Sequence, residues 1–245
     1  MYQFHTDHPT PNVYLDVARG SISNSKIVHK FGANFDIDQA TDPESVWTSG
    51  GLYPWASLAT AQTIYCLSTS ASDTTTLTLE GLDANYDEIT ETVTLTGLTA
   101  VTTTNQFLRV FRMTYDAENV GDITARVTSA SGTIVAKIDV GYAQTLMAVY
   151  TIPAGYTGYL VALDATIDGT KTCQMLMYHR LVGKPFRIAH VAESDGHYRY
   201  DFIAPLTVPE KTDIDIRIDN VSGNDARVTA NFDLVLIKDL LCCRH

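Results

Sequence analysis

Within residues 74–139 lie the runs Thr76-Leu-Thr-Leu79 and Glu91-Thr-Val-Thr-Leu-Thr96, in which small polar residues alternate with apolar ones. Alternation with a period of two places successive side chains on opposite faces of an extended strand. The runs are separated by turn-forming clusters such as Gly81-Leu-Asp-Ala-Asn-Tyr-Asp87, and no sustained helical spacing interrupts them. The segment therefore predicts antiparallel sheet.

The same rhythm continues toward the C-terminus. In Asp213-Ile-Asp-Ile-Arg-Ile-Asp219 the isoleucines share one face and the charged residues share the other. We expect a strand buried on its isoleucine face, with Asp213, Asp215, Arg217 and Asp219 in solvent. Short strands at intervals of roughly ten residues predict about ten to twelve strands and only a turn or two of helix. The predicted fold is all-β, a jelly-roll-like antiparallel β-sandwich.

Residues 1–45 differ from the rest of the chain. They contain Pro9, Pro11 and Pro43, a polar stretch, and only short apolar clusters. We expect an extended N-terminal arm with one or two short strands, which packs along the body or onto a neighbouring molecule. The predicted division is an arm over residues 1–45 and a β-sandwich domain over residues 46–245.

The amino-acid composition limits the classes of partner that this chain can bind. The 245 residues are 45% hydrophobic and 18% charged, which is typical of a folded globular protein. A net charge of −11, with scattered basic residues, argues against direct binding to nucleic acid. The sequence contains no run of about 18 apolar residues, which a membrane-spanning helix would need. The N-terminus also lacks the features of a secretory signal. We expect no membrane partner and no conventional export.

An aromatic loop contains Trp47, Tyr53 and Trp55 among two glycines and a proline. These side chains could close one end of a β core, or they could form an exposed contact patch, because Trp and Tyr dominate binding hot spots. We take the three residues as the candidate interface.

No catalytic motif emerges from the sequence. It lacks G-x-S-x-G, a phosphate-binding glycine loop and H-E-x-x-H, and its seven histidines are dispersed. Glu88, Glu91, Asp213 and Asp215 are candidates for a glycosidase carboxylate pair, but their alternation favours a solvated face. Residues 219–225 could wrap a cation through oxygen ligands, yet they read as a turn. We therefore predict no enzyme activity and no catalytic, cofactor-binding or metal-binding residues.

The four cysteines form no C-x-x-C pair. Cys66 and Cys173 stand alone in apolar strand patterns, which favours buried free thiols in a reducing environment. The adjacent Cys242 and Cys243 could bind a metal or cross-link to a partner, but small apolar roles are the simpler interpretation.

Several further runs carry a resemblance to a family of virion structural proteins from tailed bacteriophages. The resemblance spans roughly residues 30–160 and rests on turns and Thr-rich strands rather than on catalytic residues. The runs are Gly32-Ala-Asn-Phe-Asp-Ile-Asp38, Val46-Trp-Thr-Ser-Gly-Gly51, the segment 81–97, Ala100-Val-Thr-Thr-Thr104, Phe107-Leu-Arg-Val-Phe-Arg112 and the segment 144–158.

The resemblance implies a non-enzymatic component of the virus particle, assembled in the host cytoplasm and located in the virion. A capsid decoration (cement) protein is the leading expectation, with the major capsid protein or other virion proteins as partners and self-association into a homo-oligomer, for which we expect a trimer. A tail, head-to-tail or fibre component is the alternative. The aromatic loop motivates a carbohydrate- or receptor-binding module, and an acidic pair in a groove would be required for a polysaccharide hydrolase.

Overall fold

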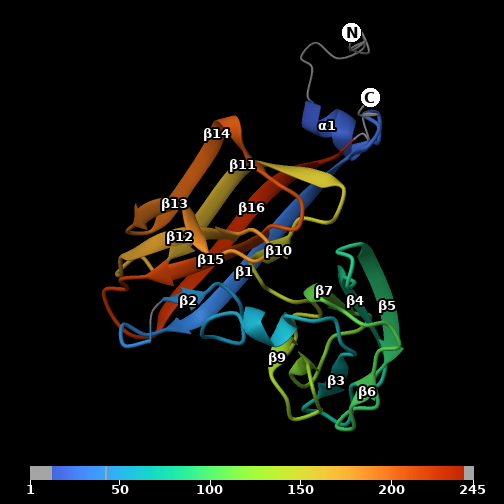
Figure 1. The fold of residues 1–245 in the computed structure, drawn as a ribbon. Helices are drawn as coiled ribbons and strands as arrows, with labels where there is room; N and C mark the ends of the chain where they lie inside the picture. The colour runs from blue at the N-terminus through green and yellow to red at the C-terminus, as the bar shows by residue number, and fades with distance from the viewer. Residues whose placement is uncertain (1–12, 42, 240–245) are drawn as a thin grey trace.

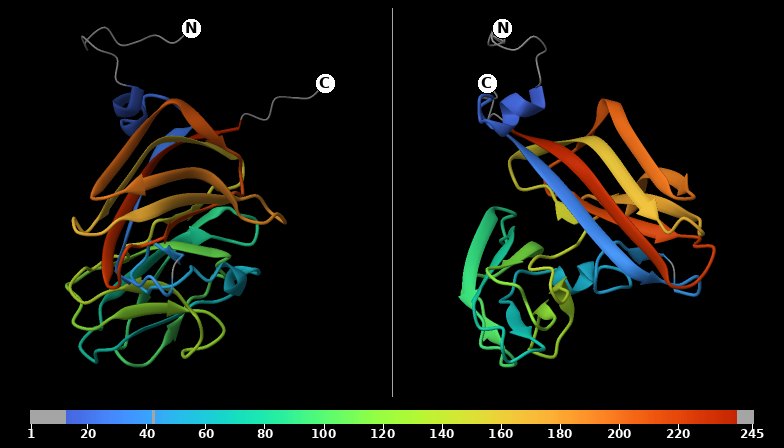
Figure 2. Two further views of the ribbon diagram at one scale, coloured as in Figure 1. Left: turned by 90° about the vertical axis from the view of Figure 1, so that its left-hand side faces the viewer. Right: turned by 180° about the vertical axis from the view of Figure 1, so that it is seen from behind.

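The computed structural model describes residues 13–41 and 43–239, which form two lobes of antiparallel β-sheet (Figures 1 and 2). The body lobe comprises residues 13–41, 43–45 and 148–239, and the inserted lobe comprises residues 46–147. The two chain crossings between the lobes lie side by side, because Trp47 and Met147 form an antiparallel bridge and Ala148 N donates to Val46 O at 2.9 Å.

Two sheets face each other in the body lobe. The β16 sheet has the strand order β1-β16-β11-β14, and the β15 sheet has the order β10-β15-β12-β13 with β2 also paired to β15. A short helix, α1 (Val13–Ala18), precedes β1. The strands are β1 (Ser25–Ile37), β2 (Glu44–Ser45), β10 (Val149–Thr151), β11 (Tyr156–Ile167), β12 (Cys173–Arg180), β13 (Arg187–Ser194), β14 (His197–Val208), β15 (Asp213–Asp219) and β16 (Ala226–Lys238).

Pairing in the body lobe is nested. When β2 is set aside, eight strands remain, and the first pairs with the last, the second with the seventh, the third with the sixth and the fourth with the fifth. The pairs are β1 with β16, β10 with β15, β11 with β14, and β12 with β13. The inserted lobe leaves the body between the first and second of these eight strands.

Two smaller sheets make up the inserted lobe. Their strand orders are β6-β3-β8-β9 and β5-β4-β7. A single 3₁₀ turn, η1 (Trp55–Leu58), precedes them. The strands are β3 (Tyr65–Ser68), β4 (Thr76–Leu82), β5 (Glu88–Thr94), β6 (Val101–Thr102), β7 (Arg109–Tyr115), β8 (Ile123–Arg126) and β9 (Ile134–Ile138).

Each lobe has its own hydrophobic core. In the body, Leu163 and Phe232 of the β16 sheet pack with Met175 and Ile216 of the β15 sheet, and all four are fully buried. A second cluster fills the inserted lobe around residues such as Phe107. Side chains from the crossing points join both cores, so the lobes are packed together.

The all-β prediction is confirmed, and the described residues contain sixteen strands, several of only two to four residues. Of the predicted arm, residues 25–37 form a single strand, β1, that is longer than the short strands expected; it belongs to the β16 sheet and pairs with β16 from Ser25 to Ile37. Residues 1–12 of that predicted arm lie outside the described residues. Of the helices in the described part, none has the length and apolarity needed to span a membrane.

Candidate functional site

Buried charges gather where the inserted lobe meets the β15 sheet. Asp213 and Asp215 project from β15 on the face opposite the isoleucines, and both are almost completely buried. Arg109 from β7 of the inserted lobe is also buried. We call this set, together with Arg180, Arg217 and Trp55, the interlobe cluster.

Asp213 is the centre of the cluster. Its Oδ1 accepts from Arg109 Nε at 2.9 Å and its Oδ2 from Arg109 Nη2 at 3.1 Å, which is a two-pronged contact between the lobes. Arg180 Nε and Nη2 also donate to Oδ2, at 2.9 and 2.6 Å, and Thr151 Oγ1 donates to Oδ1 at 2.6 Å. Paired contacts of this kind fix both distance and orientation.

Asp215 carries the second contact between the lobes. Its Oδ2 accepts from Trp55 Nε1 of the inserted lobe at 2.9 Å and from Arg217 Nε at 2.8 Å. Burial raises the pKa of Asp215, while Arg217 and the bond from Trp55 oppose that shift.

Aromatic rings cover the three arginines. The guanidinium of Arg180 lies 4.4 Å from the ring centre of Phe186, and that of Arg217 lies 4.5 Å from Tyr178. Arg109 lies 5.3 Å from the ring centre of Trp55. Such contacts stabilise cations that have lost part of their hydration.

The cluster corrects one prediction from the sequence. Asp213 and Asp215 were expected on a solvated face, but the inserted lobe covers that face. Asp213 is bound by two arginines and a threonine hydroxyl, and of these contacts the one with Arg109 joins the lobes. The arginines were missed because a single basic residue in an apolar strand does not reveal its distant partner.

Trp47, Tyr53 and Trp55, the candidate interface from the sequence, are buried, with exposed fractions of 4%, 3% and 5%. Their rings stack edge to face, with centroids 5.1 Å apart for Trp47 and Tyr53 and 4.7 Å apart for Tyr53 and Trp55. An exposed contact patch at these residues is therefore wrong. They close the inserted core against the body, which is the other interpretation that the sequence allowed.

A cleft of about 510 Å³ separates β1 from the edge of the inserted lobe, and Lys30 lies in its wall. Lys30 is 4% exposed, and its ammonium donates to the carbonyl oxygen of Phe111. Burial, assisted by the nearby Arg112, lowers the pKa of Lys30 to about 7, against the smaller effect of Glu80. No local pattern in the sequence predicts this buried amine.

Glu88 and Glu91, the other two residues of the predicted acidic set, have separate partners. Glu88 pairs with Lys26 at the cleft, and Glu91 accepts from the backbone of Thr104 at 2.6 Å and of Asn105 at 2.8 Å. The four acids of that set thus serve different contacts. Asp213 and Asp215 belong to the interlobe cluster, while the two glutamates lie on β5.

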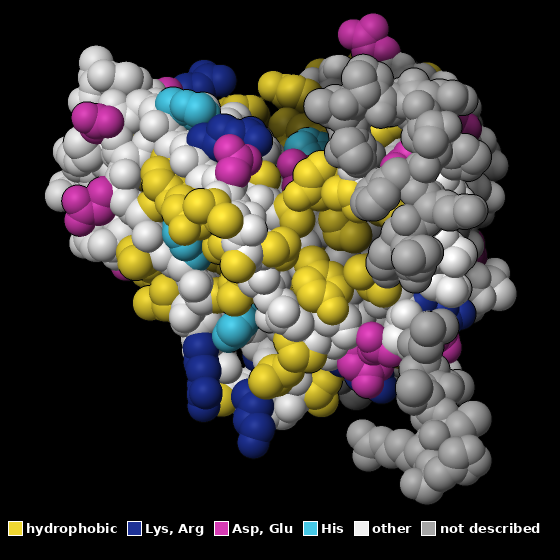
Figure 3. Space-filling view, turned by 90° about the horizontal axis from the view of Figure 1, so that it is seen from above, with side chains coloured by type: hydrophobic (Ala, Val, Ile, Leu, Met, Phe, Trp, Pro, Cys, Tyr) yellow, Lys and Arg dark blue, Asp and Glu magenta, His cyan; other side chains and the backbone are white. Residues whose placement is uncertain are grey.

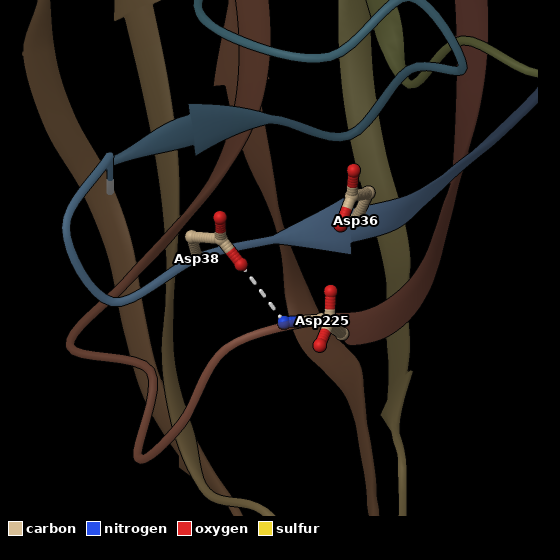
Figure 4. A group of neighbouring side chains, drawn as sticks. All are labelled: Asp36, Asp38 and Asp225. Atoms are coloured by element: carbon tan, nitrogen blue, oxygen red, sulfur yellow. Dashed lines mark hydrogen bonds between the residues drawn. The ribbon is translucent and has the colours of Figure 1, made fainter.

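An acidic triad lies at the far end of β1 (Figure 4). Carboxylate oxygens of Asp36, Asp38 and Asp225 lie within 4.8 Å of one another, and Asp38 Oδ1 accepts from the backbone N of Asp225 at 2.9 Å. The negative charge of Asp38 is the largest cause of a raised pKa at Asp36. Oxygen ligands of this type suit hard cations. Within the described residues this is the one group of three or more metal-ligating side chains, and it contains no histidine.

Cys66 and Cys173 are buried free thiols, as the sequence predicted. Burial raises the pKa of Cys66 to about 12 and that of Cys173 to about 11, so both are poor nucleophiles. Cys242 and Cys243 lie outside the described residues.

No family model matches the chain, and no curated protein does. Two solved structures from infectious bursal disease virus were found. The VP2 subviral particle shows 9% identity over 88% of this chain and 73% of that chain, with a TM-score of 0.16. The Gt strain structure shows 9% identity over 89% and 78%, also with a TM-score of 0.16. At these TM-scores the likeness carries no argument about fold or function.

Proposed function

We propose that this chain is a non-enzymatic structural protein of a virus particle, and within the particle a capsid decoration (cement) protein. The resemblance of residues 30–160 to virion proteins of tailed bacteriophages motivates the class. Its partners are the major capsid protein or other virion proteins, its location is the virion, and it acts by protein–protein contact.

We propose further that the body lobe has jelly-roll topology, and its strand pairing is what supports this. Eight strands in two facing sheets pair first with last and inward in nested order, which is what a long hairpin gives when it is rolled into a sandwich. Jelly rolls build many viral capsid proteins, and also lectins and cupins. Because one architecture serves several functions, the strand order supports the class without deciding it.

The interlobe cluster is the observation that carries a mechanical role. Its buried charges link the inserted lobe to the body: Asp213 binds Arg109 across the boundary, and Asp215 binds Trp55. The buried Asp213–Arg109 pair, bonded through both carboxylate oxygens, resists sliding of the lobes, because breaking it leaves a charge without a partner. The two lobes therefore behave as one rigid block, as a protein that holds capsomers under internal pressure must.

Copy number in purified particles tests the proposal. A cement protein is expected in hundreds of copies per particle, measured by quantitative gel or mass spectrometry against the major capsid protein. A small symmetric number of copies would instead assign the chain to the tail, neck or fibre. Absence of the chain from particles would overturn the virion assignment altogether.

The hypothesis of a carbohydrate-binding module is no longer supported by the aromatic loop. It was based on exposed Trp and Tyr rings, and Trp47, Tyr53 and Trp55 are buried. The tail or head-to-tail assignment remains the competing outcome of the copy-number measurement.

A further inference from the structure

The β16 sheet ends in a strand with an open edge. Within the described residues β14 pairs on one side only, with β11, and it lies at the margin of the sheet in Figure 1. From above, this end of the molecule shows a broad area of hydrophobic side chains with basic, acidic and histidine side chains beside it (Figure 3). An open edge of this kind is a template for another strand.

The hydrogen bond at the start of β14 shows which of its backbone N–H and C=O groups face β11 and which face away from the sheet. Ile167 N donates to Gly196 O at 2.8 Å, and hydrogen-bonded pairs alternate along an antiparallel ladder. The backbone groups of Tyr198 and Tyr200 therefore point toward β11. Those of Arg199 and Asp201 point away from the sheet and are free to pair.

The side chains of this edge are self-complementary. Residues 198–202 read aromatic, Arg, aromatic, Asp, aromatic. If two copies of the strand run antiparallel with Tyr200 opposite Tyr200, Arg199 of each copy faces Asp201 of the other. The same register places the free backbone groups of Arg199 and Asp201 opposite each other, as hydrogen-bonded pairs require.

We propose that β14 pairs with β14 of a second copy of this chain about a two-fold axis at Tyr200, which joins two β16 sheets into one continuous sheet. Charged residues on an edge strand usually discourage such pairing. Here their signs alternate, and cross-strand pairs of opposite charge are favourable. In the present chain Arg199 and Asp201 bind each other at 2.7 Å, with exposed side chains, and the second copy offers each the same partner type.

The residues of β14 that follow Asp201 are also compatible with pairing to a second copy of this chain. Between the pairs Leu160–Leu206 and Ala162–Asp201, residues 202–205 of β14 lie opposite Val161 alone, which makes a bulge in the edge strand. Phe202 packs against the body core, while residues 203–205 are exposed. Ile203 in this bulge is completely exposed. In the proposed register it faces His197 of the second copy, which would remove apolar surface from water.

This inference concerns self-association, which the family resemblance also implies, but it specifies a two-fold contact in place of the expected trimer and does not depend on the virus particle. The test is therefore done on the purified full chain by sedimentation velocity. Wild type is expected to dimerise. Arg199→Asp and Asp201→Arg each place like charges opposite one another twice, and each is expected to weaken the dimer by at least about tenfold.

A charge-swap design separates pairing from damage to the fold. The double variant Arg199→Asp/Asp201→Arg restores opposite charges and is expected to dimerise again. Mixing the two single variants is expected to give a heterodimer, because every Asp then faces an Arg. Tyr200→Cys, in a chain with Cys242 and Cys243 replaced by Ser, is expected to form a disulfide between copies, since directly opposed residues in non-hydrogen-bonded pairs are close.

The proposal is overturned by a wild-type chain that stays monomeric at about 100 μM, by single variants that associate like wild type, or by a mixture that gives no heterodimer. A trimer unaffected by these variants would also overturn β14 as the contact, yet it would leave the proposed function standing. Conversely, if the chain dimerises through β14 but is absent from virus particles, this inference stands and the proposed role in the virion is wrong.

Discussion

Strands β15 and β14 have the same kind of sequence and opposite surroundings. Both alternate apolar or aromatic residues with charged ones. The isoleucines of β15 are buried in the body core, and Tyr198 and Phe202 of β14 pack against that core. The charged face of β15, with Asp213 and Asp215, is covered by the inserted lobe. The charged face of β14, with Arg199 and Asp201, is open. Alternation thus determines which residues share a face, while distant chain segments determine what covers that face.

The difference matters because a carboxylate acts differently in the two settings. On β15 every contact of Asp213 is made inside the chain, with geometry that fixes the two lobes. On β14 the exposed Asp201 has one partner on its own strand and room for another. The buried face therefore serves stability, and the open face is available for association.

The largest expected effect comes from removing the central charge of the buried face. Asp213→Asn leaves Arg109 and Arg180 without a counter-charge and should destabilise the fold by about 3–5 kcal/mol. Denaturant unfolding measures the effect as a shift in midpoint. Asp201→Asn on β14 is the matched control and, in solution dilute enough for the wild type to be monomeric, should leave the midpoint unchanged. Equal shifts in the two variants would contradict the contrast between the strands.

The sequence predicted the strands well because alternation is a local property. It placed the isoleucines of β15 on one face, and Ile214, Ile216 and Ile218 are indeed fully buried in the body core. It could not predict that Asp213 and Asp215 are buried too. That burial depends on the lobe formed by residues 46–147, whose position no local pattern encodes.

The crossing between the lobes gives the next prediction. A side chain on Gly32 of β1 would lie 2.3 Å from both Val46 O and Ala148 N, the backbone atoms of the two crossings. Gly32→Ala should therefore force the lobes apart and cost about 1–3 kcal/mol. Gly169→Ala, in the turn after β11 with no atom within 4 Å, is the control. An unfolding midpoint for Gly32→Ala equal to that of the control would show that the crossing is loose.

The candidate site was predicted only in part, again for a physical reason. Trp47, Tyr53 and Trp55 were recognised as a unit because large aromatic residues in a Gly- and Pro-containing loop must either pack or bind. The local sequence is the same whether these residues pack in a core or bind a partner. Their burial depends on distant segments: Val110 O accepts from the Tyr53 hydroxyl, and Asp215, 160 positions away from Trp55, accepts its indole N–H.

A smaller effect is expected from Lys30, in the cleft between the lobes. In the unfolded chain the amine has its ordinary pKa of 10.5, and in the folded chain the pKa is about 7. Between these values the unfolded chain binds more protons, so this group makes the folded state more stable as pH rises. Below about pH 7 both states are protonated and the full cost of burying the charge is felt.

Lys30→Met should therefore be more stable than wild type at pH 6. Its advantage should shrink by up to about 1.4 kcal/mol per pH unit between pH 7 and 9. Urea unfolding at each pH measures the difference between the two chains. Lys26→Met controls for losing a lysine from the same strand. A difference between Lys30→Met and wild type that is constant over this range would mean that Lys30 does not release its proton on folding.

Substitutions on the open face of β14 are expected to have the smallest effect on the stability of the fold. The same substitutions are expected to have the largest effect on association. Arg199→Asp should leave the unfolding midpoint of the dilute chain unchanged, because the side chain contacts only exposed groups and the partly exposed Asp164. In concentrated solution, where wild type dimerises, wild type alone should gain stability with concentration, since dimer formation removes folded monomer. Thermal unfolding at several protein concentrations measures this. If wild type and Arg199→Asp show the same dependence on concentration, the open face of β14 takes no part in association.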